Sequence, residues 1–183
     1  MDLTNQFLIA MPSLQDPNFH RTVTYLCAHN NEGAMGIVIN RPLDLNLGEV
    51  LDHMDIDVDN GDVNDMMVLQ GGPVQRDRGF VIHEPAGEWD AVLAVGADIG
   101  VATSRDILTA VAHGDVPDRA VVALGYAGWG AGQLEREVLQ NAWLSGPADS
   151  SIIFDLPYDK RWESAARLLG VDVDRLSGEA GHA

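Results

Sequence analysis

The stretch that decides the fold is Gly-Tyr-Ala-Gly-Trp-Gly-Ala-Gly-Gln-Leu-Glu, residues 125–135. It contains four glycines and two aromatic residues, and it lies between the apolar run 120–124 and the amphipathic run 133–140. Because glycine tolerates the backbone angles of tight turns, this order predicts a strand, a tight glycine loop over 125–132 and a helix. The residues expected on the inward face of that helix are Leu134, Val138 and Leu139.

A hairpin is predicted in the N-terminal part of the chain. Apolar and polar residues alternate over 21–28, and a second strand-like run covers 35–40. Residues 30–33, Asn-Asn-Glu-Gly, lie between these runs and tolerate the positive backbone angles of a short turn. The two runs therefore predict an antiparallel hairpin, preceded by a short strand over 7–11.

A second hairpin-like pair is predicted around Gly71-Gly72-Pro73. The runs 67–69 and 79–83 flank these residues, and Pro85 ends the second run because proline cannot donate to a strand ladder. The other predicted elements are a helix over 47–54, an acidic solvated loop over 55–65, a helix capped by Thr103 or Ser104 that ends at Gly114, a strand over 151–154 and a helix from Pro157 to Gly170.

The order of these elements predicts the fold class. Strands come in pairs early in the chain and alternate with helices later, which favours an α+β fold with a mixed, largely antiparallel sheet. The many glycines suit a bent sheet or a small barrel. We expect one domain over residues 1–170 and a polar C-terminal tail over 171–183, which is composed of small and polar residues from Leu176.

The composition is that of a globular domain with a strongly acidic surface. Of the 183 residues, 46% are hydrophobic and 21% are charged, and the net charge is −17 at pH 7. A field of this sign repels nucleic-acid backbones and anionic lipids. The nearest approach to a basic cluster is Arg76 with Arg78, and no basic recognition helix is present, so direct DNA binding is disfavoured.

Cys27 is the single cysteine of the chain. It excludes an internal disulfide and a cysteine-based metal framework, and it fits a reducing compartment. The first residues lack the pattern of a signal peptide, and no apolar run approaches the roughly 20 residues of a membrane span. We therefore expect a cytoplasmic protein with no membrane association.

The glycine stretch has the position of a phosphate-binding loop, because a loop between a strand and a helix presents backbone amides to anions. Its spacing matches neither standard nucleotide fingerprint, and no lysine follows it. Glu135 and Glu137 lie in the first turns of the predicted helix, where their charges would repel phosphate. A tight turn that packs Tyr126 and Trp129 is the favoured interpretation.

Cys27 and His29 lie two residues apart on one predicted strand, which would place both side chains on the same face. A thiol and an imidazole so placed are the minimal pair for nucleophilic catalysis. No third residue that orients them can be named, so an inert buried cysteine is favoured.

Four residues, Asp16, His20, His29 and His83, are of types that bind divalent metal ions. No helical His spacing joins them, and Pro17 interrupts the segment between the first two. Turn capping by Asp16 and ordinary histidines are favoured, and no metal or other cofactor is expected.

Hydroxyl chemistry has little support, because Ser13 and Ser104 lack the Gly-x-Ser-x-Gly elbow of serine hydrolases. Asn40 and Arg41 end a predicted strand at Pro42, where polar groups are well placed to line a pocket. The alternative is a solvated strand end in which Arg41 pairs with a carboxylate.

Three blocks of sequence carry a family resemblance, and they read LIAMPSLQDPNFHRTVTYLCAHNNEGAMGIVIN from Leu8, GGPVQRDRGFVIH from Gly71 and ALGYAGWGAGQLEREVLQNAWL from Ala123. Over about residues 3–170 the chain resembles the YqgE/AlgH family of small bacterial proteins. The resemblance implies a bifurcated sheet that includes a small barrel, surrounded by helices. It implies no established reaction. Members of the family often carry the label of transcriptional regulator. The resemblance also implies a Holliday-junction-resolvase-like protein as a candidate partner.

The family motifs mark a set of residues that we expect to converge in space as a ligand- or partner-binding site. Their types suit a pocket for a small polar ligand or a docking surface for a protein. The residues are Asp16, Asn18, His20, Arg21, Asn40, Arg41, Gly71, Gly72, His83, Tyr126, Trp129, Gln133 and Glu135.

The leading hypothesis for function is a non-enzymatic interaction or ligand-sensing module that acts in regulation through a protein partner, because no nucleophile, base and orienting residue can be assembled from this set. One alternative is a hydrolase-like or other enzyme for a small polar or anionic substrate, with His83 as general base and Arg41 as anion clamp. The other is a regulator that contacts DNA directly, which the net charge of −17 disfavours.

Overall fold

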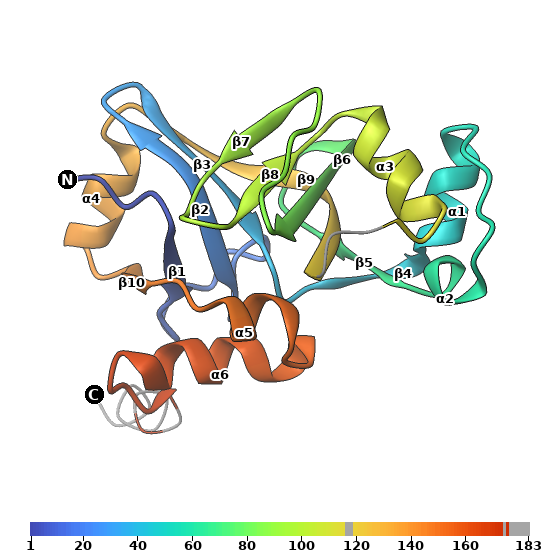
Figure 1. Cartoon of the computed structure of the whole chain (residues 1–183). Coiled ribbons are helices and arrows are strands. Elements are labelled where there is room, and N and C mark those ends of the chain that lie inside the picture. Colours follow the sequence, from blue (N-terminus) through green and yellow to red (C-terminus); the bar gives the residue numbers. More distant parts are fainter. Residues whose placement is uncertain (116–118, 174, 176–183) are drawn as a thin grey trace.

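A curled sheet of ten strands forms the centre of the molecule in the computed structural model, which describes residues 1–115, 119–173 and 175 (Figure 1). Eight of these strands follow one continuous path, and every pairing along it is antiparallel. In spatial order the path runs through β10 (Trp143–Pro147), β1 (Gln6–Ala10), β2 (Val23–Asn30), β3 (Gly33–Val38), β9 (Arg119–Gly130), β6 (Val74–Glu84), β8 (Gly100–Ala102) and β7 (Val92–Ala94).

A branch of two strands makes the sheet bifurcated. β4 (Pro42–Asn46) pairs antiparallel with β5 (Met67–Gln70), and β5 pairs in parallel with the first half of β9. The second half of β9 pairs with β3. The predicted α+β class with a mixed, largely antiparallel, bifurcated sheet is confirmed, and the small barrel is present as a half-barrel.

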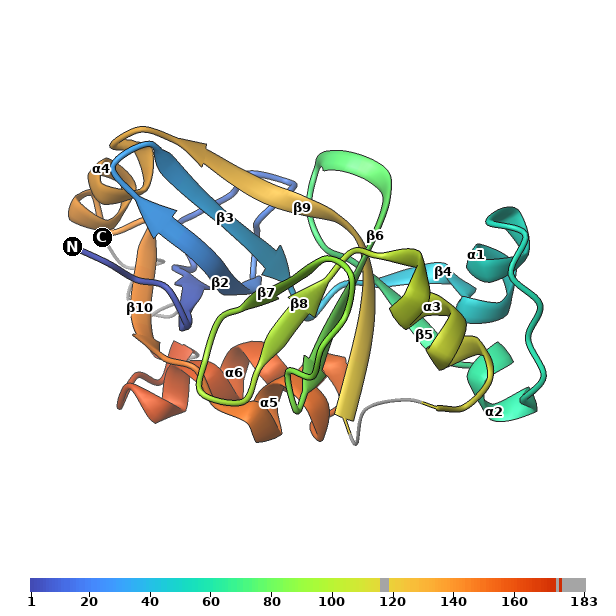
Figure 2. The ribbon, with the colours of Figure 1, turned by 45° about the horizontal axis from the view of Figure 1, so that its top comes forward.

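The glycine stretch does not form the predicted loop. β9 continues through it to Gly130, and a left-handed residue, Gly132, precedes the helix α4 (Gln133–Leu139). Gly125 has a φ of 80° and lies where the neighbour of β9 changes from β5 to β3. Figure 2 shows β9 as one long strand that bends between the two halves of the sheet. The prediction of a helix after the glycines is confirmed.

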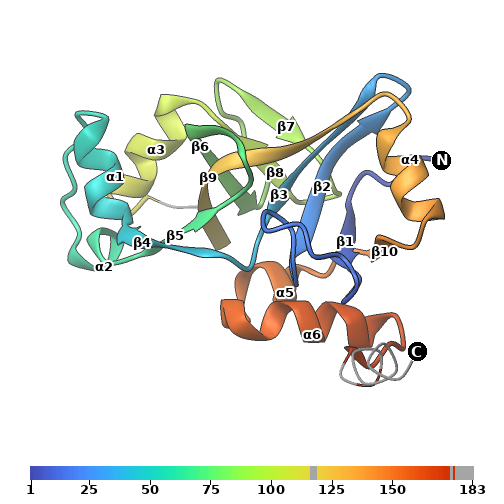
Figure 3. The same ribbon diagram turned by 180° about the vertical axis from the view of Figure 1, so that it is seen from behind.

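Six helices surround the sheet in the part of the chain that the structure describes. Figure 3 shows α5 and α6 together along one side of the sheet, and α1, α2 and α3 gathered at the end opposite α4. Their bounds are α1 (Leu47–His53), α2 (Gly61–Asn64), α3 (Arg105–Ala112), α4 (Gln133–Leu139), α5 (Ser150–Phe154) and α6 (Tyr158–Leu168).

Several local predictions are confirmed. β2 and β3 form the predicted hairpin, with Asn30 opposite Gly33. α1 lies within the predicted 47–54, and Asn46 caps it by accepting a hydrogen bond from the Glu49 amide. α6 follows Pro157 as predicted, and a left-handed Gly170 lies beyond its end.

Two predicted strand features are wrong. The run 151–154 is helical, because Asp149 accepts a hydrogen bond from the Ser151 amide and starts α5. The runs around Gly71-Gly72-Pro73 do not pair with each other, since β5 and β6 both pair with β9, on its two sides. Periodicity identified these runs as apolar, but it contained no information on which segments they pair with.

Three further details differ from the predictions. The acidic segment 55–65 is not wholly a solvated loop, because it contains α2 and buries Ile56 and Val63 against α1 and α3. Leu139 is 78% exposed instead of facing inward. Ser104, not Thr103, is the N-cap of α3, and its hydroxyl donates to the Asp106 carboxylate.

The described residues form three hydrophobic clusters. One lies inside the half-barrel and reaches α5 and α6, one joins β5, β6 and β9 to α1, α2 and α3, and one packs α4 against β1, β2 and β9. Val171 and Val173 pack against the first cluster. Of the expected tail, residues 171–173 and 175 are described, and residues 174 and 176–183 lie outside the described residues. None of the described helices is long and apolar enough to cross a membrane.

Candidate functional site

A groove of about 880 Å³ lies on the concave side of the half-barrel. Its walls come from β6, β7 and β8 on one side and from the β2–β3 hairpin and β9 on the other. The curl of the sheet leaves apolar side chains exposed on this inner side. The larger apolar residues that line the groove are Met35, Phe80, Leu93, Val101, Tyr126 and Trp129, and the polar ones include Asn30, Glu32, Arg78 and Thr103.

Arg78 reaches the groove from an irregular bulged segment of β6. Val74 pairs with Tyr126 and Gly79 with Leu124, so residues 75–78 have no regular partners in β9. The Arg78 guanidinium lies 5.4 Å from the centre of the Phe80 ring and donates to the Gln75 side chain at 3.2 Å. Among the described residues, no carboxylate forms an ion pair with Arg78.

β7 is an edge strand that borders the groove. Among the described strands β7 pairs with β8, with Leu93 opposite Val101. The Ala91 carbonyl accepts from the Thr103 amide and the Val95 amide donates to the Ile99 carbonyl. Hydrogen-bonded residues alternate in an antiparallel ladder, so Ala91, Leu93 and Val95 are the residues of this strand that face β8. The backbone groups of Val92 and Ala94 therefore point to the open edge.

The segment around Asp16 is fastened to the end of β3. Asp16 accepts a hydrogen bond from the Asn18 amide, which confirms the turn-capping interpretation. The Asn40 side chain donates to the Arg21 carbonyl and accepts from the Val23 amide. The Arg41 guanidinium donates to the carbonyls of Pro17 and His20 at 2.7 and 2.9 Å.

Arg41 therefore holds a loop together, and no carboxylate of the described residues forms an ion pair with it. Partial burial lowers its pKa, while the nearby Asp16 charge acts in the opposite direction. Arg21 lies with its guanidinium 4.5 Å from the centre of the Trp162 ring. His20 contacts the Leu14 carbonyl through Nδ1. The Arg41 guanidinium and His20 Nδ1 are thus used within the protein.

An aromatic cluster centred on the Glu137 carboxylate joins α4 to this loop. Trp129 and Trp143 donate their indole N–H groups to the same oxygen of Glu137, at 3.3 and 3.1 Å, and Gln133 donates to the other oxygen. The Phe19 ring stacks on Trp129 with centroids 6.0 Å apart. Trp129 thus contributes to both this cluster and the groove.

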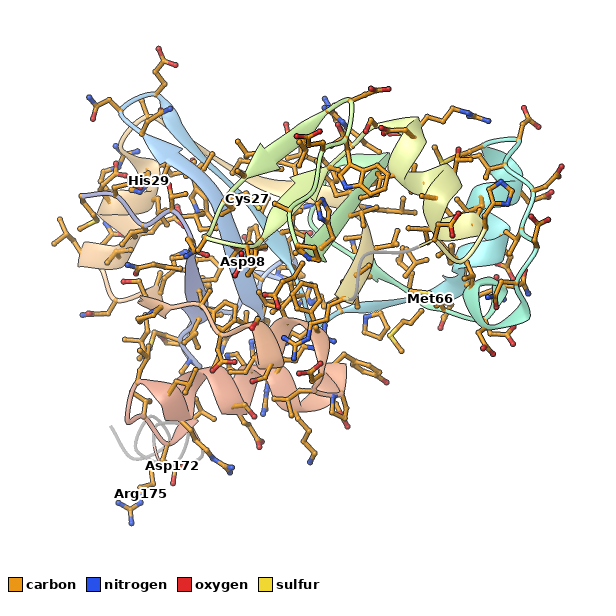
Figure 4. All side chains as sticks on the ribbon, in the orientation of Figure 1. Cys27, His29, Met66, Asp98, Asp172 and Arg175 are labelled. Atoms are coloured by element: carbon orange, nitrogen blue, oxygen red, sulfur yellow. The ribbon has the colours of Figure 1, made fainter. Side chains whose placement is uncertain are left out.

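His29 and Cys27 do not form a pair. A bulge between Leu26 and Ala28 inserts Cys27 as an extra residue, so His29 lies on the opposite face to Cys27 (Figure 4). His29 bonds Glu135 through Nε2 and accepts from the Leu3 amide through Nδ1. Cys27 lies in the half-barrel core, where burial raises the pKa of its thiol to about 12. The prediction that the two side chains share a face is wrong.

His83 is fully buried, away from the other expected site residues. Its Nδ1 lies 2.8 Å from the Pro85 carbonyl, and its ring lies edge-on to Trp89. Desolvation lowers its pKa, partly opposed by the bond to Pro85. This placement gives no support to a general base that reaches a substrate together with Arg41.

Gly71 and Gly72 are required for close backbone packing. A Cβ atom at Gly71 would lie 2.3 Å from the Gly125 carbonyl oxygen, and one at Gly72 would lie 2.1 Å from the Tyr126 carbonyl carbon. The Gly71 backbone also bonds Val38 and Leu124. These two glycines let the segment after β5 cross β9.

The structure thus brings together part of the expected set and separates the rest. No group of three or more His, Cys, Asp or Glu residues that could hold a metal ion occurs in the described ranges. One group comprises the loop before β2 and the end of β3 to which it is fastened: Asp16, Asn18, His20, Arg21, Asn40 and Arg41. Trp129, Gln133 and Glu135 lie at α4, Tyr126 lines the groove with Trp129, Gly71 and Gly72 lie at the β9 crossing, and His83 is in the core.

Sequence reasoning did not identify Leu93 or the β7 edge, and it treated Arg78 only as part of a weak basic cluster. The signal available for Arg78 was its place between Asp77 and Gly79 in a run that is too polar to be a buried strand. For Leu93 no local signal exists, because its groove is formed by strands far apart in the sequence.

The comparison with known families agrees with the geometry. A family model described as AlgH-like matches residues 7–174. A UPF0301 protein of Nitrosococcus oceani is 56% identical over 179 residues, which cover 98% of this chain and 96% of that protein. A UPF0301 protein of Thioalkalivibrio sulfidiphilus is 59% identical over 182 residues, which cover 100% of this chain and 97% of that protein.

Two solved structures share the fold. The solution structure of AlgH from Pseudomonas aeruginosa matches with a TM-score of 0.83 and 48% identity, over 100% of this chain and 97% of that one. A crystal structure of a protein from Corynebacterium diphtheriae matches with a TM-score of 0.74 at 17% identity, over 96% of this chain and 91% of that one. The second likeness concerns the fold alone.

Proposed function

Because the chain belongs to the AlgH-like family, we propose that it is a non-enzymatic binding module that takes a ligand or a protein partner in the groove of its half-barrel. The observation that carries this proposal is the groove itself, about 880 Å³ of mainly apolar lining with one arginine that has no carboxylate partner among the described residues. Binding sites combine these features: an apolar concave surface and a few polar groups that orient the occupant.

The placement of the chemically active side chains favours binding over catalysis. Cys27 is buried with a thiol pKa of about 12, so it has almost no thiolate at neutral pH. His83 lies in the core, and His29 is engaged at both ring nitrogens. No side chain of this group lines the groove, whose lining is mainly apolar with Asn30, Glu32, Arg78 and Thr103 as polar residues.

We place the module in the cytoplasm and in regulation through a protein partner, for which a Holliday-junction-resolvase-like protein is one candidate. A single buried cysteine suits a reducing compartment. The net charge of −17 favours a partner with a basic surface, because long-range attraction accelerates the encounter.

A photocrosslinking experiment tests the groove directly. Benzoylphenylalanine replaces Leu93, which is 45% exposed and lines the groove, or Leu139, which is 78% exposed on α4 as a matched control. Both variants are tagged, irradiated in native cells and purified after nuclease treatment, and the adducts are read by mass spectrometry. Native mass spectrometry of the unirradiated protein detects a bound small molecule.

The proposal expects a partner or small ligand attached at position 93 and absent at position 139. Adducts that occur equally at both positions, together with no copurifying small molecule, would contradict a site in the groove. Adducts that disappear with nuclease treatment would instead support the DNA-contacting alternative.

A further inference from the structure

We infer that the occupant of the groove is an extended polypeptide segment that adds a strand to β7, places alternate apolar side chains in the groove and sets one carboxylate against Arg78. This inference rests on the proposed function and names the class of partner. The segment belongs to another protein, with basic residues outside the groove.

The first argument is the open edge of β7. Natural edge strands discourage pairing by being short or by carrying a charged side chain, a proline or a bulge. β7 is short, with three residues, but it reads Val-Leu-Ala, has no charged side chain, proline or bulge within them, and exposes 45% of Leu93. The N–H and C=O groups of Val92 and Ala94 form a row with strand spacing, which the backbone of another strand matches.

The second argument is the arrangement of side chains beside that edge. A strand paired with β7 would direct every second side chain to the concave face, next to Leu93 and Val101, which oppose each other across β7 and β8. Phe80 and Tyr126 continue the apolar lining further into the groove. A small apolar molecule could fill this lining, but it would leave the row of backbone groups at Val92 and Ala94 without a matching partner.

The third argument is charge. The chain has 28 acidic and 11 basic side chains other than histidine, yet Arg78 has no ion-pair partner among the described residues. It stacks on Phe80 at the groove and leaves donors for a carboxylate of the segment. A second copy of the chain is disfavoured as occupant, because two molecules of charge −17 repel each other.

A peptide selection on the intact protein tests the inference. Random dodecapeptides displayed on phage are selected against the immobilised full chain, and enriched sequences are synthesised with a fluorescent label for anisotropy titration. We expect enriched peptides with alternating apolar residues and one acidic residue, whose affinity falls with rising salt concentration.

Variants identify the site. Arg78→Gln should weaken the enriched peptide at least tenfold, and it should have little effect on a version in which the acidic residue is an amide. Arg76→Gln changes the same bulge at a residue that does not line the groove. The affinity of this variant for the enriched peptide should therefore stay within twofold of that of the wild type. Val92→Pro removes an edge N–H that does not serve the β8 ladder and should also weaken binding at least tenfold.

The peptide itself provides a readout that does not depend on the folding of variants. N-methylation of successive residues should reduce affinity with a period of two, because only every second peptide N–H faces β7. Failure to enrich any peptide, or affinity that is insensitive to Arg78→Gln and to the methylation pattern, would overturn the inference.

Two outcomes separate this inference from the proposed function. If no peptide is enriched but native mass spectrometry finds a small molecule that competes with crosslinking at position 93, the groove is a ligand site and only the inference fails. If sedimentation shows a dimer that Val92→Pro dissociates, β7 pairs with a second copy and the inference also fails.

Discussion

At the scale of single residues, the Glu137 carboxylate links α4 to two tryptophan side chains. Its carboxylate accepts from two indole N–H groups and from Gln133, and it holds Trp129 and Trp143 in fixed positions below Phe19. A buried donor that loses its acceptor keeps the full cost of its desolvation.

We therefore expect Glu137→Ala to lower the free energy of unfolding by about 1–3 kcal/mol, as measured by urea denaturation, with a change in tryptophan fluorescence. Glu137→Gln keeps one acceptor oxygen and should cost less. Glu163→Ala, in α6, is the matched control, because none of the described hydrogen bonds or ion pairs involves Glu163. Equal losses for Glu137→Ala and Glu163→Ala would show that the indole bonds contribute nothing.

Cys27 provides a second prediction at this scale. Burial raises the pKa of its thiol from the ordinary 9.0 to about 12, and burial also raises that of Tyr25. A raised pKa means that the folded state holds the proton at a pH where the unfolded chain releases it. Stability is therefore fully present below about pH 9 and falls between pH 9 and about 12, by up to about 1.4 kcal/mol per pH unit from this thiol.

Urea denaturation at a series of pH values measures this slope, and Cys27→Ala should make it shallower above pH 9. Iodoacetamide at pH 8 should label the thiol only after denaturation. Labelling of the native protein at the rate of a free cysteine would contradict the buried position of Cys27.

At the scale of elements, the crossing of the Gly71–Gly72 segment over β9 determines how the two halves of the sheet join. Gly72 and Gly125 face each other at the crossing: a Cβ atom at Gly125 would lie 2.5 Å from the Gly72 carbonyl oxygen. Gly125 also has a left-handed φ of 80°, which a residue with a Cβ adopts at a cost of about 1–2 kcal/mol.

Gly72→Ala and Gly125→Ala should each lower the free energy of unfolding by at least about 2 kcal/mol, because backbone atoms must move as well. Gly61→Ala is the control, since a Cβ atom there meets nothing within 4 Å. Thermal unfolding measures all three. A Gly72→Ala protein as stable as Gly61→Ala would mean that the crossing relaxes at no cost.

The loop fastened to the end of β3 is a second element-scale case. Arg41 donates to two carbonyls of the loop, and the Phe19 and His20 amides bond the Asp16 carbonyl within it. In Arg41→Ala we expect faster hydrogen exchange at the Phe19 and His20 amides, while the amides of β2 stay protected.

Arg76→Ala removes an exposed arginine elsewhere and should leave these exchange rates unchanged. If Arg41→Ala also leaves them unchanged, Arg41 does not hold the loop and its donors are open to a ligand, as the strand-end interpretation allowed.

At the scale of the whole molecule, the net charge of −17 decides which partners approach. We expect no shift of duplex DNA in gel electrophoresis at micromolar protein and about 0.1 M salt, because the field repels the phosphate backbone and no basic recognition helix offsets it. A protein of opposite net charge and similar size is the positive control. A sequence-specific shift would restore direct DNA contact as the function.

The sequence by itself determined those features that depend on neighbouring residues. Asn-Asn-Glu-Gly specified the β2–β3 turn, and Pro157 and Gly170 marked the ends of α6. The charge composition determined the sign of the electrostatic field around the molecule. Of the motif residues that were expected to converge, those around Asp16, Asn40 and Arg41 lie together, whereas His83 lies apart from them in the core. These signals depend on neighbouring residues or on composition, so the amino-acid sequence alone contains them.

Only the tertiary structure decided how the glycine stretch and the groove are built. The stretch is a strand because β6 and β3 supply its hydrogen bonds, and its glycines serve close backbone contacts that distant residues impose. Cys27 and His29 are separated by a bulge whose partner strand is β3. Leu93, Arg78 and Tyr126 line one groove because the sheet curls. The curl results from pairings between segments far apart in the chain, which periodicity does not record.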